Sequence, residues 1–270
     1  VLFPPLLFLS VAQSRLTPSS AALFLSVGVS SMLLAVVASA SLRLFIKDNP
    51  VTHASVFQCG FRFNTYIGFS ICLQLFDQTG FALLALLIAF WVPISNTIAV
   101  SVLASAVAKA EGGAVGKKHS VFKTIVTNPL IIATVLGLAW NVTGWTIPTV
   151  PAVFLKHLGS ASLAMGLLCI GAGLRLQAFR GHGALIVAST IERLMVVPAI
   201  AWGMGAVFGL SSVQAGVLLL FAALPTAQSC YVMTATMRGD AASVAGVTTA
   251  QTLAAMATLP VWTALIQSLT

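Results

Sequence analysis

Charged side chains are scarce in this chain. Only 7% of its 270 residues are charged, whereas 59% are hydrophobic, and the mean hydropathy is +1.03. A soluble domain carries roughly 25% charged residues, so this composition excludes a soluble globular protein and predicts an integral membrane protein. Apolar runs of helical length recur along the chain, without the alternating pattern of transmembrane β-strands. The predicted fold class is therefore an all-α polytopic membrane protein.

Cysteines and enzymatic motifs are also few. The four cysteines lie inside apolar runs, with spacing that matches neither a disulfide framework nor a metal site. The sequence contains no His-Glu-x-x-His, Gly-x-Ser-x-Gly or P-loop motif, and no pair of aspartates within an apolar run. We expect no metal, no cofactor and no enzymatic activity. It also lacks the repeated filter sequence or ring of like charges that an ion channel uses.

Nine apolar segments make up most of the chain. The first segment would span only about 18 Å as a helix, which is too short for a hydrocarbon core of roughly 30 Å. The chain also begins without Met. We therefore expect a truncated N-terminus or a start in the middle of a helix. The predicted segments are 1–12, 20–42, 54–76, 80–106, 124–143, 148–174, 183–208, 213–236 and 241–267.

The net charge of +8 follows the loops. Nine Lys and Arg residues fall in alternate loops on one side, and only Arg15 falls on the other. The positive-inside rule then predicts cytoplasmic basic loops and a C-terminus outside. Since the charge excess has this topological explanation, we expect no nucleic-acid partner. The nine residues are Arg43, Lys47, Lys109, Lys117, Lys118, Lys123, Arg175, Arg180 and Arg238, and the acids Asp48, Asp77, Glu111 and Asp240 also fall in loops.

The longest loop divides the chain into two parts. We predict an N-terminal repeat over 1–106, a cytoplasmic loop over 107–123 and a C-terminal repeat over 124–270. One additional N-terminal helix would give two halves of five helices with opposite orientations. Segment 54–76 is interrupted by polar residues between Arg62 and Gly68, and segment 213–236 by Pro225 and the polar residues after it. Pro93 and Pro260 form a second matching pair in the segments that follow.

The two interrupted segments have the chemistry of an anion site. Proline inside a helix removes a backbone hydrogen bond, and membranes tolerate the freed groups only next to protein or a watery cavity. Each new half-helix presents free N–H groups and a positive dipole end that favour a carboxylate. A packing kink is the alternative interpretation. The predicted substrate-binding residues are Arg62, Asn64, Gly68, Pro225, Thr226, Gln228 and Tyr231.

Glu192 is the one acid inside an apolar segment. Such a position costs roughly 2.5–3.5 kcal/mol or more unless the carboxylate is paired or hydrated. We predict either a proton carrier or a structural partner for the Arg or backbone of another helix. Arg193 points about 100° away on a helix, so the two neighbours do not automatically pair. Arg62 has two interpretations as well, since it could line the anion pathway or extend to the headgroups.

Several short motifs occur in a specific order along the chain. They are Arg62-Phe63-Asn64, Asn128-Pro129-Leu130-Ile131-Ile132, Ile170-Gly171-Ala172-Gly173-Leu174, Ala222-Ala223-Leu224-Pro225-Thr226 and Arg238-Gly239-Asp240. Together they resemble the auxin efflux carrier family, which includes bacterial malonate-type permeases and plant auxin exporters. The resemblance implies ten helices, two five-helix repeats, an extracellular N-terminus and broken helices that cross at the membrane centre. Phe69-Ser70 and Ala164 stand where the family often has proline.

These observations together predict a secondary carrier for small organic anions such as mono- and dicarboxylates, working by alternating access. The resemblance further implies a moving unit formed by 20–106 and 183–267, and a scaffold that could form a homodimer. We expect a multi-pass protein of the plasma membrane, most simply the cytoplasmic membrane of a bacterium. Proton coupling through Glu192 and flux driven by the membrane potential both remain open. An anion channel-like pore and a non-transporting membrane sensor are the alternative functions.

Overall fold

The computed structural model describes residues 4–13, 18–76, 78–112, 129–172 and 183–269. All regular structure in these residues is helical, which confirms the all-α prediction for this part of the chain. Residues 113–123 of the predicted cytoplasmic loop lie outside it. So do Arg15, Asp77, Lys117, Lys118, Lys123, Asn128, Gly173, Leu174, Arg175 and Arg180.

The helices follow the predicted segments closely. Segment 54–76 is divided into α3, η1 and α4, and segment 213–236 into α11 and α12. Segment 183–208 contains the π-helical turn η3 between α9 and α10. The elements are α1 (Pro4–Ala12), α2 (Pro18–Phe45), α3 (Pro50–Phe57), the 3-10 turn η1 (Gln58–Gly60), α4 (Thr65–Leu75), α5 (Gln78–Ala110), α7 (Pro129–Thr143), α8 (Thr149–Ala172), α9 (Gly183–Ile191), η3 (Glu192–Val196), α10 (Val197–Val207), α11 (Ser212–Ala223), α12 (Ser229–Thr236) and α13 (Ala241–Leu269).

Four stretches of the described residues are long and apolar enough to cross a membrane. They are Ala21–Phe45, Gln78–Ala110, Gly183–Val207 and Ala241–Ser268. Pro93 and Pro260 lie inside two of these stretches, and both helices continue through the proline. Four such helices together with the composition are typical of an integral membrane protein.

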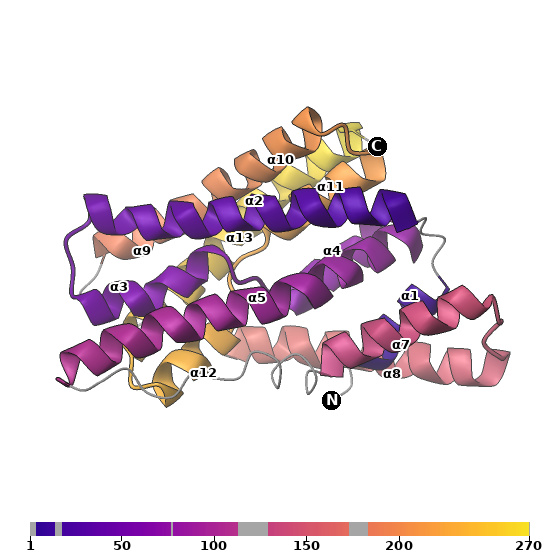
Figure 1. Cartoon of the computed structure of the whole chain (residues 1–270), viewed down its shortest axis with the longest axis horizontal. Coiled ribbons are helices and arrows are strands. Elements are labelled where there is room, and N and C mark those ends of the chain that lie inside the picture. Colours follow the sequence, from indigo (N-terminus) through magenta and orange to yellow (C-terminus); the bar gives the residue numbers. More distant parts are fainter. Residues whose placement is uncertain (1–3, 14–17, 77, 113–128, 173–182, 270) are drawn as a thin grey trace.

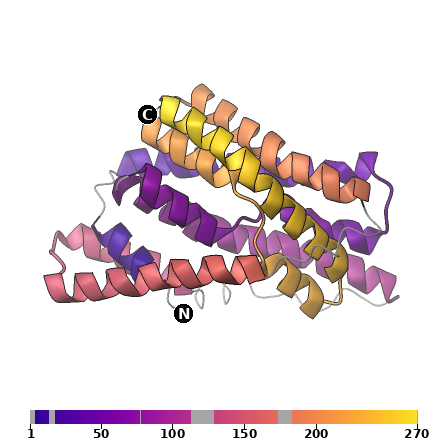
Figure 2. The same ribbon diagram turned by 180° about the vertical axis from the view of Figure 1, so that it is seen from behind.

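The helices form two groups with α5 running between them (Figures 1 and 2). On one side, α1 packs against α7 and α8. On the other side, α10 packs against α2 and α11, and α13 packs against α9, α11 and α12. α5 contacts helices of both groups, including α1, α7, α2 and α11. α3 and α4 of the first divided segment and α11 of the second also pack against α5.

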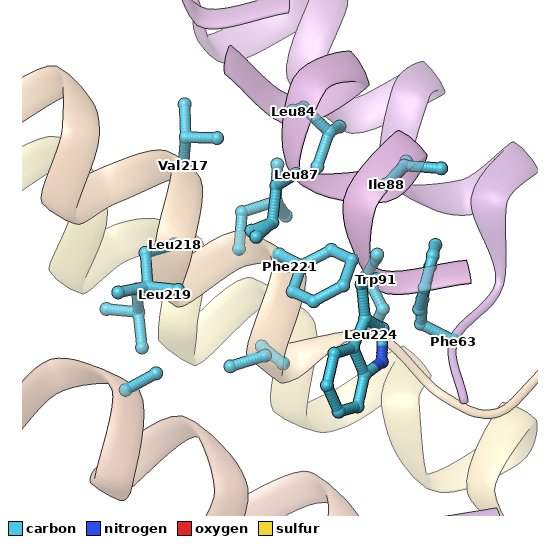
Figure 3. Close-up of a cluster of buried hydrophobic side chains, with 14 of the residues drawn as sticks. Phe63, Leu84, Leu87, Ile88, Trp91, Val217, Leu218, Leu219, Phe221 and Leu224 are labelled. Atoms are coloured by element: carbon cyan, nitrogen blue, oxygen red, sulfur yellow. The ribbon is translucent and has the colours of Figure 1, made fainter. Parts of the chain in front are cut away.

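Apolar side chains of α5 and α11 make the core beside these divided segments (Figure 3). Trp91 of α5 and Phe221 of α11 are fully buried. Phe63, from the connection between η1 and α4, places its ring centroid 4.3 Å from that of Phe221. Since both aromatic rings come from the divided segments, their packing holds the two segments together. The other labelled residues of this cluster are Leu84, Leu87, Ile88, Val217, Leu218, Leu219 and Leu224.

Polar residues fix where several helices begin. Asn49 accepts a hydrogen bond from the Val51 N–H (2.8 Å) and precedes Pro50, the first residue of α3. Ser211 caps α11 as half of a capping box. Asp240 caps α13 through the Ser243 N–H (3.0 Å). These starts are therefore set by local sequence.

Contacts at one end of the molecule join the two predicted repeats. The Asp240 carboxylate accepts a hydrogen bond from the Thr52 hydroxyl of α3 (2.8 Å), and the Asp240 N–H donates to Ser55 Oγ (2.9 Å). Arg238, between α12 and α13, lies 3.8 Å from the Glu111 carboxylate after α5. Three of the predicted loop regions therefore lie at the same end, as the predicted topology requires.

Candidate functional site

The two interruptions of the helices touch each other. The chain leaves helical geometry at Phe61–Asn64, between η1 and α4, and again at 224–228, between α11 and α12. The Asn64 N–H donates a hydrogen bond of 2.8 Å to the Pro225 carbonyl. Two backbone segments that are distant in sequence are therefore joined directly at the point where both lack helical hydrogen bonds. We refer to 61–64 as the first break and to 224–228 as the second break.

The first break lies earlier than the sequence analysis placed it. It ends at Asn64, whose side chain accepts hydrogen bonds from the N–H groups of Tyr66 (3.2 Å) and Ile67 (3.3 Å) and so starts α4. The Gly68 N–H already donates to the Asn64 carbonyl (3.0 Å). The prediction that the interruption extends to Gly68 is therefore wrong, because asparagine is a strong N-cap.

Gly68 serves close packing instead. A Cβ atom at this position would lie 2.7 Å from Cδ1 of Leu224, which belongs to the second break. The absence of a side chain thus lets the first turn of α4 approach the second break. The role of Gly68 in substrate binding stays a prediction.

Arg193 satisfies carbonyl groups that the breaks leave free. Its side chain is fully buried. Nε donates to the Leu224 carbonyl (2.7 Å), Nη2 to the Phe221 carbonyl (3.3 Å) and Nη1 to the Gly60 carbonyl (3.2 Å). The guanidinium has five donors in a planar fork, so one side chain can bridge the ends of α11 and η1.

Gln251 of α13 and Trp91 of α5 complete this support. Gln251 Oε1 accepts from the Thr226 N–H (3.0 Å), and its Nε2 donates to the Ser189 carbonyl (3.2 Å). Trp91 Nε1 donates to the Phe61 carbonyl (2.9 Å). Buried backbone groups need such partners when the helical ones are missing. Each break is therefore held by side chains from other helices.

Arg62 points from the first break toward the second. Its guanidinium donates to Gln58 Oε1 (2.8 Å), to Ser229 Oγ at the start of α12 (2.9 Å) and to Met233 Sδ (3.3 Å). The side chain is half-buried. The guanidinium therefore lies beside both breaks, and its part in an anion pathway stays a prediction.

The predicted residues of the second break differ in accessibility. Pro225 and Thr226 are buried, and the Thr226 hydroxyl lies 3.2 Å from Cys230 Sγ. Gln228 and Tyr231 are half-buried. The Gln228 Nε2 group is shielded from solvent and has no hydrogen-bond partner. It is thus a donor at the start of α12 whose hydrogen bonds are unused, beside the Ser229 hydroxyl that Arg62 contacts.

Glu192 is buried at the start of η3, with 4% of its surface exposed. Oε1 accepts a hydrogen bond from the Ser39 hydroxyl of α2 (2.8 Å), and Oε2 has no partner. Gly60 allows this close approach, since a Cβ atom there would overlap the Ser39 hydroxyl and the Glu192 carboxylate. The hydrogen-bond partner is therefore a hydroxyl, not the Arg or backbone of another helix.

Several residues of this site were not predicted from the sequence. Ser39, Trp91 and Gln251 lie in apolar runs, where a single polar or aromatic residue is usually a packing residue. Arg193 carried a detectable signal, because a buried arginine in a membrane segment needs partners. The identity of those partners depends on the tertiary fold.

We find no group of three or more His, Cys, Asp or Glu side chains arranged to hold a metal among the described residues. Cys59, Cys72 and Cys230 are buried. The donors at the breaks are amides, hydroxyls and the guanidinium groups of Arg62 and Arg193, a set that suits an anion better than a metal ion.

Comparison with known proteins agrees with this architecture. The chain is 22% identical to an uncharacterized transporter of Methanocaldococcus jannaschii over 171 residues, which cover 62% of this chain and 53% of the relative. The chain thus spans about half the length of the curated relative it matches. The family model described as "Membrane transport protein" matches residues 1–263. The chain therefore belongs to this membrane transport protein family, the auxin efflux carrier family that its motifs resemble.

Proposed function

We propose that this protein is a secondary carrier for small organic anions and that the anion binds where the two breaks meet. The observation that carries the proposal is the Asn64–Pro225 hydrogen bond, which joins the start of α4 to the second break. The Arg62–Ser229 hydrogen bond adds the start of α12 to the same place. The N-terminus of a helix favours negative charge, because its dipole end is positive. Two such ends beside each other suit a carboxylate.

The side chains around the breaks support an anion rather than a cation. Arg62 supplies a positive charge, Gln228 an unpaired amide donor, and Asn64, Ser229 and Tyr231 further polar groups. Glu192 is the one acid inside a predicted membrane segment. A mono- or dicarboxylate with a small apolar body fits this combination of polar donors and surrounding aromatic side chains.

Alternating access then requires that the breaks move relative to other helices. Arg193 and Gln251 attach the second break and the end of η1 to η3 and α13, so we propose that these elements move together. This is compatible with the proposed moving unit of 20–106 and 183–267, and with α1, α7 and α8 as a scaffold that forms a homodimer. The repeats over 1–106 and 124–270, cytoplasmic basic loops and an outside C-terminus belong to the same proposal.

The test is flux into proteoliposomes with acetate, malonate and succinate as probes, under imposed potential and pH gradients. We expect saturable flux of at least one of these carboxylates. Gln228→Leu removes the unpaired amide donor and should reduce this flux. Thr258→Val is the matched control, because Thr258 Oγ1 is also shielded and without a partner but lies in α13 away from the breaks.

Each alternative function has a distinct result in this assay. A channel-like pore would give flux that does not saturate, and a sensor would give binding without flux. Chemical change of the carboxylate would indicate an enzyme, which we propose this protein is not. If Thr258→Val and Gln228→Leu reduce the flux to the same degree, the proposal that the anion binds at the second break is contradicted.

A further inference from the structure

The Glu192 carboxyl and the His53 imidazole line the same small cavity. The volume of the cavity is about 10 Å³, and its other polar lining residues are Ser39 and Ser189. One water molecule needs a cavity of about 10–15 Å³ and two to four polar partners. The cavity therefore has the size and the lining of a site for a single water.

Glu192 has an unused acceptor at this cavity. Oε1 is occupied by the Ser39 hydroxyl (2.8 Å), whereas Oε2 is buried and has no protein partner. Leaving a buried carboxyl oxygen unpaired is unfavourable, so a water in the adjacent space would satisfy it.

His53 has a free lone pair in its neutral form. Its Nε2 lies 2.7 Å from the Ile46 carbonyl, and a carbonyl only accepts, so Nε2 carries the hydrogen. Nδ1 is then the nitrogen that can take up a proton. The ring lies in the first turn of α3, directly after the loop that connects α2 and α3, and it is 8% exposed. His53 thus stands between that loop and the interior.

Few other groups can exchange a proton with Glu192. The elements packed against η3 are α2, α9, α10, α11, α13 and η1. α9, α10, α11 and α13 contain no titratable side chain, and the one charged residue of α2 is the exposed Arg43. η1 contributes the buried Cys59 thiol, and the Arg193 guanidinium is directed at the carbonyls of the breaks.

We propose that one water in this cavity transfers a proton between His53 Nδ1 and Glu192 Oε2. His53 first binds a proton at Nδ1. The Nδ1–H bond then breaks as the water accepts that proton, and the water gives one of its own protons to Oε2. His53 returns to its neutral form and Glu192 becomes a neutral acid, so one proton moves and nothing else is consumed. This route deepens the proposed function, on which its role in coupling rests.

Protonation at this point would be sensed at the first break. The Glu192 carboxyl lies against Gly60, whose carbonyl accepts a hydrogen bond from the neighbouring Arg193 (3.2 Å). Protonation of Glu192 removes a negative charge beside the Arg193 guanidinium, which joins the end of η1 to the second break. The same proton can therefore bias the arrangement of the proposed anion site.

The test is infrared spectroscopy of the reconstituted protein after a rapid pH jump, which reads the carboxyl band directly and needs no transported anion. The band of Glu192 is assigned as the one lost in Glu192→Gln. We expect His53→Phe to slow its appearance by roughly tenfold or more, equivalent to about 1.4 kcal/mol added to the barrier. His157→Phe is the control, since His157 is an exposed histidine of α8.

Ser189→Val provides a second variant, which keeps both titratable residues and fills the space for water. It should slow the band as His53→Phe does. An unchanged rate in both variants would overturn the proposal. So would the absence of any pH-dependent Glu192 band, or a band that responds to sodium at fixed pH instead. Because the readout is independent of flux, a failed carrier assay leaves this result interpretable, and the reverse also holds.

Discussion

Replacing Arg193 with methionine should destabilise the protein strongly. The change keeps an unbranched side chain of similar length but leaves the carbonyls of Leu224, Phe221 and Gly60 without their donor. A buried carbonyl without a partner costs about 1–3 kcal/mol. The bond to Leu224 is short at 2.7 Å, and the other two are long at 3.3 and 3.2 Å, so we place the sum at about 4–6 kcal/mol.

Part of this loss is offset. Arg193 is a fully buried charge, and removing it also removes its desolvation penalty. A net destabilisation of about 3–5 kcal/mol is then expected. For a chain of this size each kcal/mol changes Tm by about 2–4 °C, so Tm should fall by roughly 6–20 °C.

The assay is thermal unfolding of the detergent-purified protein, followed by tryptophan fluorescence. Arg238→Met is the matched control, because this side chain is 82% exposed and its ion pair with Glu111 is a surface contact. Arg193→Lys should lie between wild type and Arg193→Met, since one ammonium cannot reach all three carbonyls in the geometry of the planar fork. A Tm of Arg193→Met equal to that of the control would refute this account of how the breaks are held.

Two glycine substitutions test the close approaches around the breaks. Gly60→Ala would place a Cβ atom 2.6 Å from Glu192 Oε1 and should lower Tm by several degrees, whereas Gly171→Ala has open space around it and should not. Gly68→Ala would meet Leu224 Cδ1 at 2.7 Å. The loss of unfolding free energy caused by Gly68→Ala should be smaller by about 1 kcal/mol or more in a protein that also carries Leu224→Ala. If the effects of the two substitutions on the unfolding free energy simply add, the contact between these residues is contradicted.

Much of the helical arrangement could be predicted from the sequence, because apolar runs and prolines carry local information. Pro225 cannot donate a helical hydrogen bond, so the second break was predicted at its observed position. The first break was placed too far along the chain. Asn64 is a typical N-cap, and giving this signal more weight would have ended the break there.

The support of the breaks could not be predicted in the same way. Arg193 contacts carbonyls from two distant segments, and Gln251 reaches a backbone N–H of the second break from α13. Such partners are set by tertiary packing, and neither hydropathy nor local spacing indicates them. His53 is similar, because a lone histidine near the end of an apolar segment has no distinguishing sequence signal.

The proposed function requires that residues of both breaks form one anion site. The direct measurement is a double-mutant cycle with Arg62→Gln and Gln228→Leu, using the KM of whichever test carboxylate shows saturable flux. If one carboxylate contacts both side chains, each variant should raise the KM and the double variant should raise it less than the product of the two. A coupling of about 1 kcal/mol, roughly a fivefold deviation, is expected. Independent effects that multiply, or a KM unchanged in either variant, would contradict a shared site.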